Sequence, residues 1–143
     1  MTDADAAKTG RRHLAAGWWA ICVFALGGLA LEALHGVKAG FYLDPANETR
    51  RLLLRLAHAH GTLIALVNVV YGLTVRQEPG AARSVASPAL LAALILVPGG
   101  FFVGGLVIHG GDPGLGVLLV PGGALALTVG AALVARAVGK GEA

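Results

Sequence analysis

The side chains best suited to chemistry in this 143-residue chain are imidazoles that fall near the ends of apolar segments. Neutral imidazole binds copper, zinc and iron, and two histidines on facing helices can hold a b-type haem between them. Two carboxylates lie at the same segment ends and would add oxygen ligands. The candidate metal ligands are therefore His35, His58, His60, His109, Glu32 and Asp112.

The spacing within this set limits what it can bind. Glu32 and His35 form an E-x-x-H pair, which places both side chains on one helical face, as in metal-binding helical bundles. Only one such pair occurs, so we do not expect a di-iron site, which needs two pairs and two further glutamates. On a helix, His58 and His60 point about 200° apart and cannot both bind one ion. The sequence leaves open which of them faces the other helices, and whether these histidines bind a ligand or only cap helix ends.

The elements that must position these residues are transmembrane helices. The chain is 56% hydrophobic and 13% charged, whereas soluble proteins average about 45–50% and about 25%. A helix needs about 20 apolar residues to cross a hydrocarbon core of about 30 Å, and segments of that kind cover residues 13–34, 56–75, 88–108 and 115–135. We therefore predict an all-α fold, an integral membrane four-helix bundle with up-down-up-down topology, in a single domain of residues 1–143.

Local signals predict where some helices begin and end. Asp44-Pro45 combines an N-cap with proline at the first helical position, so the helix that holds the second span begins near residue 45 and projects beyond the hydrocarbon. Gly36 and Gly40 are expected to end the first helix in a left-handed conformation. Residues 1–10 are polar without an apolar period, and we predict a mobile tail there.

Lysine and arginine predict the orientation. Seven of the eleven lie on the side of the termini and four on the other side, so the positive-inside rule predicts cytoplasmic termini. We expect a multi-pass protein of a bacterial cytoplasmic membrane, with the candidate ligands at its extracytoplasmic end. His13 is the one histidine expected on the cytoplasmic side. The short connection at residues 109–114 makes the third and fourth spans antiparallel neighbours.

Small residues indicate how the spans pack. The third and fourth spans each contain LVPGG, at residues 96–100 and 119–123. Each proline removes a backbone hydrogen bond and is expected to bend its helix, at a similar depth in the two neighbours. Stripes of small residues at four-residue spacing favour close helix packing, within the protein, in a homo-oligomer or in a larger membrane complex; they are Gly100 with Gly104, and Gly122 with Ala126 and Gly130.

Asn68 is a polar side chain in the middle of the second span, and hydrocarbon offers it no water, so we expect it to face other helices or a site. The net charge of +3 comes from basic residues at helix ends, which is not a nucleic-acid footprint. The spans contain no serine and the lone Cys22 is far from the histidines, so nucleophilic catalysis has little support.

Three functions are compatible with these features. The first, and the one we favour over catalysis, is binding of a metal ion or haem b at the histidine-rich end. The second is a non-catalytic accessory or structural subunit that packs in a larger membrane complex through its Gly/Ala faces. The third is a small-solute transporter, for which the spans lack a continuous polar path.

Overall fold

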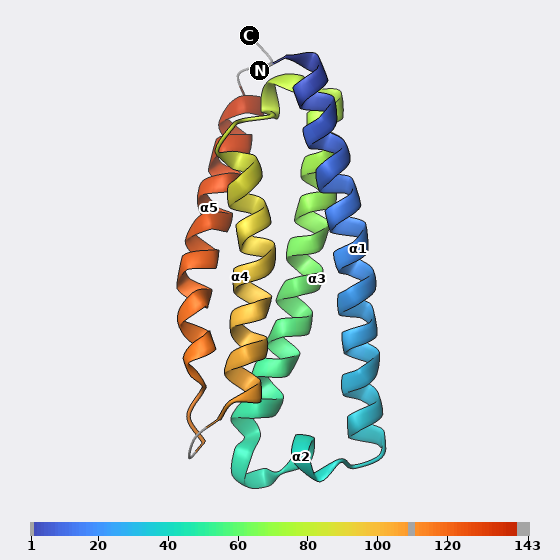
Figure 1. Ribbon diagram of the computed structural model, residues 1–143, viewed down its shortest axis with the longest axis vertical. Helices are drawn as coiled ribbons and strands as arrows, with labels where there is room; N and C mark the ends of the chain where they lie inside the picture. The colour runs from blue at the N-terminus through green and yellow to red at the C-terminus, as the bar shows by residue number, and fades with distance from the viewer. Residues whose placement is uncertain (1, 109–110, 140–143) are drawn as a thin grey trace.

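A computed structural model of the chain describes residues 2–108 and 111–139, apart from the side chain of Asn47. It is built on four long helices (Figure 1), α1 (Asp3–Gly36), α3 (Glu48–Gln77), α4 (Ala86–Leu106) and α5 (Leu119–Val138). Short pieces connect them: α2 (Gly40–Leu43), η1 (Pro45–Asn47), η2 (Pro79–Ala81) and η3 (Leu115–Leu118). All four long helices, α5 together with η3, are long and apolar enough to cross a membrane, which confirms the four predicted apolar helices.

The long helices stand side by side in chain order (Figure 1). α1 packs on α3, α3 on α4, and α4 on α5. Within the described residues, α1 and α5 do not pack along each other, so the row is open and these two helices are its edges. The edge helices expose large apolar side chains, including Trp19 on α1 and Leu125 on α5. The central helix α3 has protein on two sides, which decides where its polar residues can point.

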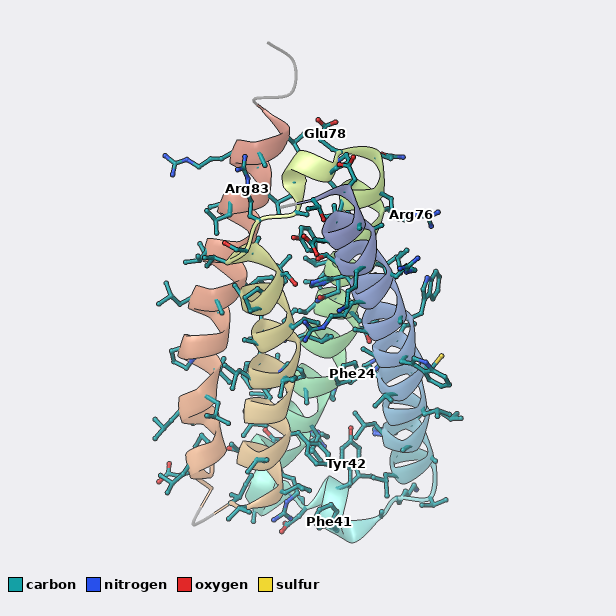
Figure 2. All side chains as sticks on the ribbon, turned by 45° about the horizontal axis from the view of Figure 1, so that its top comes forward. Phe24, Phe41, Tyr42, Arg76, Glu78 and Arg83 are labelled. Atoms are coloured by element: carbon teal, nitrogen blue, oxygen red, sulfur yellow. The ribbon has the colours of Figure 1, made fainter. Side chains whose placement is uncertain are left out.

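The two ends of the row differ in composition. Arg76, Glu78 and Arg83 lie at the end where α1 begins and α5 finishes, and Phe41 and Tyr42 lie at the opposite end (Figure 2). We call these the terminal end, formed by the start of α1, η2 and the end of α5, and the α2 end. The terminal end encloses a buried cluster that includes Ala6, Tyr71 and Leu90.

Helix ends agree with the sequence signals in part. The Asp44 carboxylate accepts a hydrogen bond from the Ala46 amide at 2.9 Å, as expected for a cap before Pro45. The expected left-handed glycines after α1 are absent; Lys38 instead has a φ of 52°. The prediction of a mobile tail over residues 1–10 was wrong, because α1 already begins at Asp3. A capping box between Thr2 and Asp5 satisfies amides of its first turn, a polar signal that does not need an apolar period.

Glycine lets α1 and α3 approach to backbone contact. A Cβ at Gly17 would lie 2.8 Å from the Ala65 carbonyl oxygen and 2.9 Å from the Val69 nitrogen. A Cβ at Gly72 would lie 2.9 Å from the Gly10 carbonyl oxygen. Any side chain at these positions would push the helices apart, so these glycines fix how closely and at which register α1 packs on α3.

The repeated LVPGG segments pack against each other. A Cβ at Gly100 would lie 2.9 Å from Val120 Cγ2, and one at Gly123 would lie 2.7 Å from Val97 Cγ2. Each valine thus packs on the last glycine of the other repeat, which places the repeats at the same depth. Pro98 lies inside α4, whereas Pro121 is the third residue of α5, just after η3 leads into that helix. On the last span, Gly130 packs on Leu90 and Ala126 packs beside Ala93 and Val97, in line with the predicted stripe, but its first member is wrong, because Gly123 and not Gly122 contacts α4.

Candidate functional site

His58 and His60 face different neighbours of α3. His58 Nδ1 donates a hydrogen bond of 2.7 Å to the carbonyl oxygen of Phe24 on α1. His60 Nδ1 lies 3.0 Å from the Leu56 carbonyl oxygen of its own helix, and its ring packs on Phe101 of α4 at 5.0 Å between centroids. Both side chains are half-buried. His58 and His60 point about 200° apart on α3. Because α3 has a neighbouring helix on each side, each of the two rings still contacts protein.

The His58 ring packs against α1 at Gly28, where there is no side chain. A Cβ at Gly28 of α1 would lie 2.5 Å from His58 Cε1 and 2.9 Å from its Nδ1, so only glycine leaves room for the imidazole there. Because a carbonyl oxygen only accepts, the proton of a neutral His58 ring is on Nδ1. Nε2 then carries a free lone pair, and the described residues offer it no hydrogen-bond donor.

His58 lines an apolar cleft of about 380 Å³ between α1, α3 and α4. Phe24, which points into the middle of the row in Figure 2, and Phe102 bring aromatic rings to its wall. Gly27 and Gly99 also line it, and neither has another group within 4 Å of the place where a Cβ would stand. The other lining residues are Val23, Leu31, Leu54, Ala57, Leu94, Ile95 and Pro98. His58 thus provides a polar side chain in a cleft whose other described lining residues are aliphatic, aromatic, proline or glycine.

The other predicted ligands lie apart from this cleft. Glu32 and His35 are exposed near the end of α1, where they line a shallow hollow with Tyr42, Arg51 and Arg55. Asp112 is exposed in the connection between α4 and α5, which lies at the opposite edge of the row (Figure 1). His109 lies outside the described residues.

The open row explains why Asp112 does not meet Glu32 and His35, whereas Glu32 and His58 line a common hollow beside Gly28. α3 and α4 stand between the end of α1 and the connection before α5 (Figure 1). Over residues 2–108 and 111–139, no group of three or more His, Cys, Asp or Glu side chains is arranged to hold a metal ion. A metal site built from the full predicted set stays a prediction that depends on His109.

A second polar cluster, which the sequence did not predict, lies toward the terminal end. His13 and Asn68 are both 0% exposed. His13 Nδ1 is 2.7 Å from Asn68 Oδ1, and His13 Nε2 is 2.8 Å from Ser87 Oγ. Asn68 Nδ2 donates to the carbonyl oxygens of Ile64 at 2.9 Å and Leu90 at 3.4 Å. These contacts join α1, α3 and α4, and we call His13, Asn68 and Ser87 the three-helix relay.

Tyr71 borders the relay on α3. Its ring stands edge-on to the His13 ring, with 4.6 Å between centroids. Its hydroxyl is buried. His13 is therefore enclosed by one aromatic ring and two hydrogen-bonding side chains.

Helix register would have revealed the relay. His13 lies ten residues after the start of α1, and Asn68 lies nine residues before the end of α3. Because these helices are antiparallel neighbours with 1.5 Å of rise per residue, the two side chains reach the same level. Residues 1–10 were predicted to be a mobile tail, so the start of the first helix, from which His13 has to be counted, was not available. Comparisons with protein-family models, with curated proteins and with solved structures found no match to this chain.

Proposed function

We propose that this chain is an integral membrane protein that binds haem b in the apolar cleft, with His58 as an axial ligand. The observation that carries the proposal is the hydrogen bond from His58 Nδ1 to the Phe24 carbonyl oxygen. Histidines that bind metals usually donate their second ring N–H to a carbonyl or carboxylate, which fixes the ring and leaves the other nitrogen as the ligand. His58 already has this arrangement.

The walls of the cleft also support a planar apolar ligand. Its volume of about 380 Å³ lies in the range of about 300–1,000 Å³ that is typical of ligand sites. Gly27 and Gly99 let a flat ring approach the backbones of α1 and α4. Phe24 and Phe102 provide aromatic surface. Among the described residues that line the cleft, one is a histidine, so we propose that the haem iron has one protein ligand, the imidazole of His58.

The membrane placement belongs to the same proposal. The excess of lysine and arginine near the termini supports cytoplasmic termini in a bacterial cytoplasmic membrane. His58 then lies in the extracytoplasmic half of α3. Fusion of a periplasmic reporter enzyme to the C-terminus should give no reporter activity, whereas fusion after Lys38 should give activity.

Haem titration of the detergent-purified chain tests the proposal. We expect wild type to bind one haem with a Soret shift, and His58→Ala to weaken the affinity at least tenfold. His60→Ala is the matched control, because His60 is half-buried on the same helix but faces Phe101 and not the cleft. Gly99→Leu should block binding by filling the cleft, whereas Gly122→Leu on α5, also in open space, should not. Equal affinity in wild type and His58→Ala would refute the proposal.

A second candidate function, a structural subunit, is favoured by the open row. α1 packs mainly on α3 and α5 mainly on α4, and both present large apolar side chains outward. A partner helix, from a second copy or another protein, would pack on such an edge through van der Waals contacts, as transmembrane helices do. Native mass spectrometry from mild detergent distinguishes this candidate, because it requires a stable complex larger than one chain and no haem.

A further inference from the structure

The three-helix relay has one defined direction of hydrogen bonding. Asn68 Nδ2 donates to two carbonyl oxygens, which fixes the orientation of the amide. Asn68 Oδ1 therefore faces His13, and since this oxygen only accepts, His13 Nδ1 carries a proton. In the neutral ring Nε2 is then an acceptor, and the Ser87 hydroxyl donates to it.

This order matches the arrangement by which enzymes activate a serine. A hydroxyl is a weak nucleophile until a base within about 2.6–3.2 Å takes its proton, and the base is held in the correct tautomer by a third group. Here the Ser87 to His13 distance is 2.8 Å and the His13 to Asn68 distance is 2.7 Å. Each ring nitrogen contacts the group that this chemistry requires.

The position of Ser87 on α4 adds to this arrangement. Ser87 is the second residue of α4 and is partly exposed, whereas His13 is fully buried. No side chain caps the first turn of α4. The amides of Ser87 and Ala89 donate to the Arg83 and Val85 carbonyl oxygens at 3.4 and 3.2 Å, and Pro88 has no N–H, so only the dipole of the helix favours negative charge beside Ser87.

We propose that Ser87 is a nucleophile for acyl transfer, with His13 as its general base and Asn68 as a positioning residue. Ser87 Oγ bonds to the carbonyl carbon of an ester or thioester while His13 Nε2 takes the hydroxyl proton. The bond to the leaving alcohol or thiol then breaks, and the leaving group takes that proton from Nε2. Water releases the acyl group by the same route, which yields a carboxylic acid and restores Ser87.

The surroundings point to a lipophilic acyl substrate. α4 begins one residue before Ser87, so the hydroxyl lies at the boundary of a candidate span, the depth at which a membrane holds the linkage between its polar and apolar parts. Leu91 and Ile95 follow Ser87 on α4 at four-residue spacing, so they lie near its helical face; Leu91 is partly exposed and Ile95 is 70% exposed. An acyl chain that starts at Ser87 can thus lie along apolar side chains at the surface of α4, away from the polar end.

A long-chain alkyl fluorophosphonate, which phosphonylates activated serine oxygens with loss of fluoride, tests this site on the detergent-purified full chain. The sequence contains two serines, Ser84 and Ser87, so the chain includes its own control. Ser84 is exposed three residues away, outside the relay. We expect one adduct per chain on Ser87, formed at least about 100-fold faster than any adduct on Ser84. Ser87→Ala should abolish it, and Ser84→Ala should not change its rate.

The variants of the relay separate chemistry from packing. His13→Gln should lower the maximal rate of labelling at least about 100-fold with little change in the probe concentration that gives half that rate. Asn68→Ala should lower the same maximal rate about tenfold or more. Should either variant fail to fold, the ratio of labelling at Ser87 to that at Ser84 in wild type decides the question. Labelling of Ser87 no faster than Ser84, or a maximal rate unchanged in folded His13→Gln, would overturn the proposal. The test does not involve His58 or haem, so it can fail independently of the proposed function.

Discussion

Replacement of Asn68 by alanine is the perturbation that most directly measures how the polar cluster holds α1, α3 and α4 together. The substitution removes the hydrogen bonds that Asn68 makes to His13 on α1 and to the Leu90 carbonyl oxygen on α4. It also leaves the His13 Nδ1 proton without an acceptor at a position that is 0% exposed. Stability should therefore fall although no apolar contact surface is lost.

The magnitude follows from two terms, because the loss of the bond to His13 and the unpaired His13 proton are one event. A hydrogen bond between transmembrane helices, here the one to Leu90, contributes about 0.6 kcal/mol on average and up to about 1.7 kcal/mol. A buried polar group left without a partner, here His13 Nδ1, costs about 1–3 kcal/mol. We therefore expect Asn68→Ala to lower the free energy of unfolding by about 2–5 kcal/mol.

Equilibrium unfolding in mixed micelles with a rising fraction of dodecyl sulfate, followed by the fluorescence of Trp18 and Trp19, measures this change. Thr74→Val is the matched control, because Thr74 Oγ1 donates only to the Val70 carbonyl oxygen of its own helix, at 2.9 Å. The control should stay within about 0.5 kcal/mol of wild type. An Asn68→Ala variant as stable as Thr74→Val would refute the reasoning. In the double variant with His13→Ala, the losses should be smaller than additive by about 1 kcal/mol or more, because both changes remove one contact.

Two further predictions concern helix packing, and the same unfolding measurement checks both. Gly17→Ala should destabilise the protein by about 1–3 kcal/mol, because the added Cβ meets the backbone of α3, whereas Gly27→Ala, with open space around it, should not. Gly123→Ala should separate α4 from α5 at a similar cost, while its neighbour Gly122→Ala should leave stability unchanged or higher, since alanine favours helix over glycine. Equal effects within either pair would contradict the packing described above.

The long helices could be predicted because hydrocarbon imposes a length and a composition on any helix that crosses it. The depth of the LVPGG repeats could be predicted as well, since a short connection makes antiparallel neighbours of α4 and α5. Contacts at Gly100 and Gly123 confirm that the repeats face each other. Ala126 and Gly130 of the predicted stripe do pack toward α4, but the choice between the adjacent Gly122 and Gly123 could not be made from the sequence, because both are glycine.

Which of the candidate side chains lie close together depends on the arrangement of the helices, and this could not be predicted from the sequence. Glu32, His35 and Asp112 were grouped because they fall on the same side of the membrane, and a closed bundle would bring that side of every helix to one centre. The open row separates Asp112 from Glu32 and His35, which share one hollow. It also gives α3 two protein neighbours, so His58 and His60 both make contacts. Asn68 was expected to face other helices, and it does. Its partners His13 and Ser87 were missed because each was judged from its place at a span end, without the register of the neighbouring helices.

The optical spectrum of the chain purified from haem-replete cells tests the central claim most directly. The account predicts a Soret band in the oxidised protein and sharpened α and β bands after dithionite reduction, with one haem per chain. These bands should be lost in His58→Ala and kept in His60→Ala. A spectrum without a Soret band in protein from such cells, or bands that persist unchanged in His58→Ala, would contradict haem binding in this cleft.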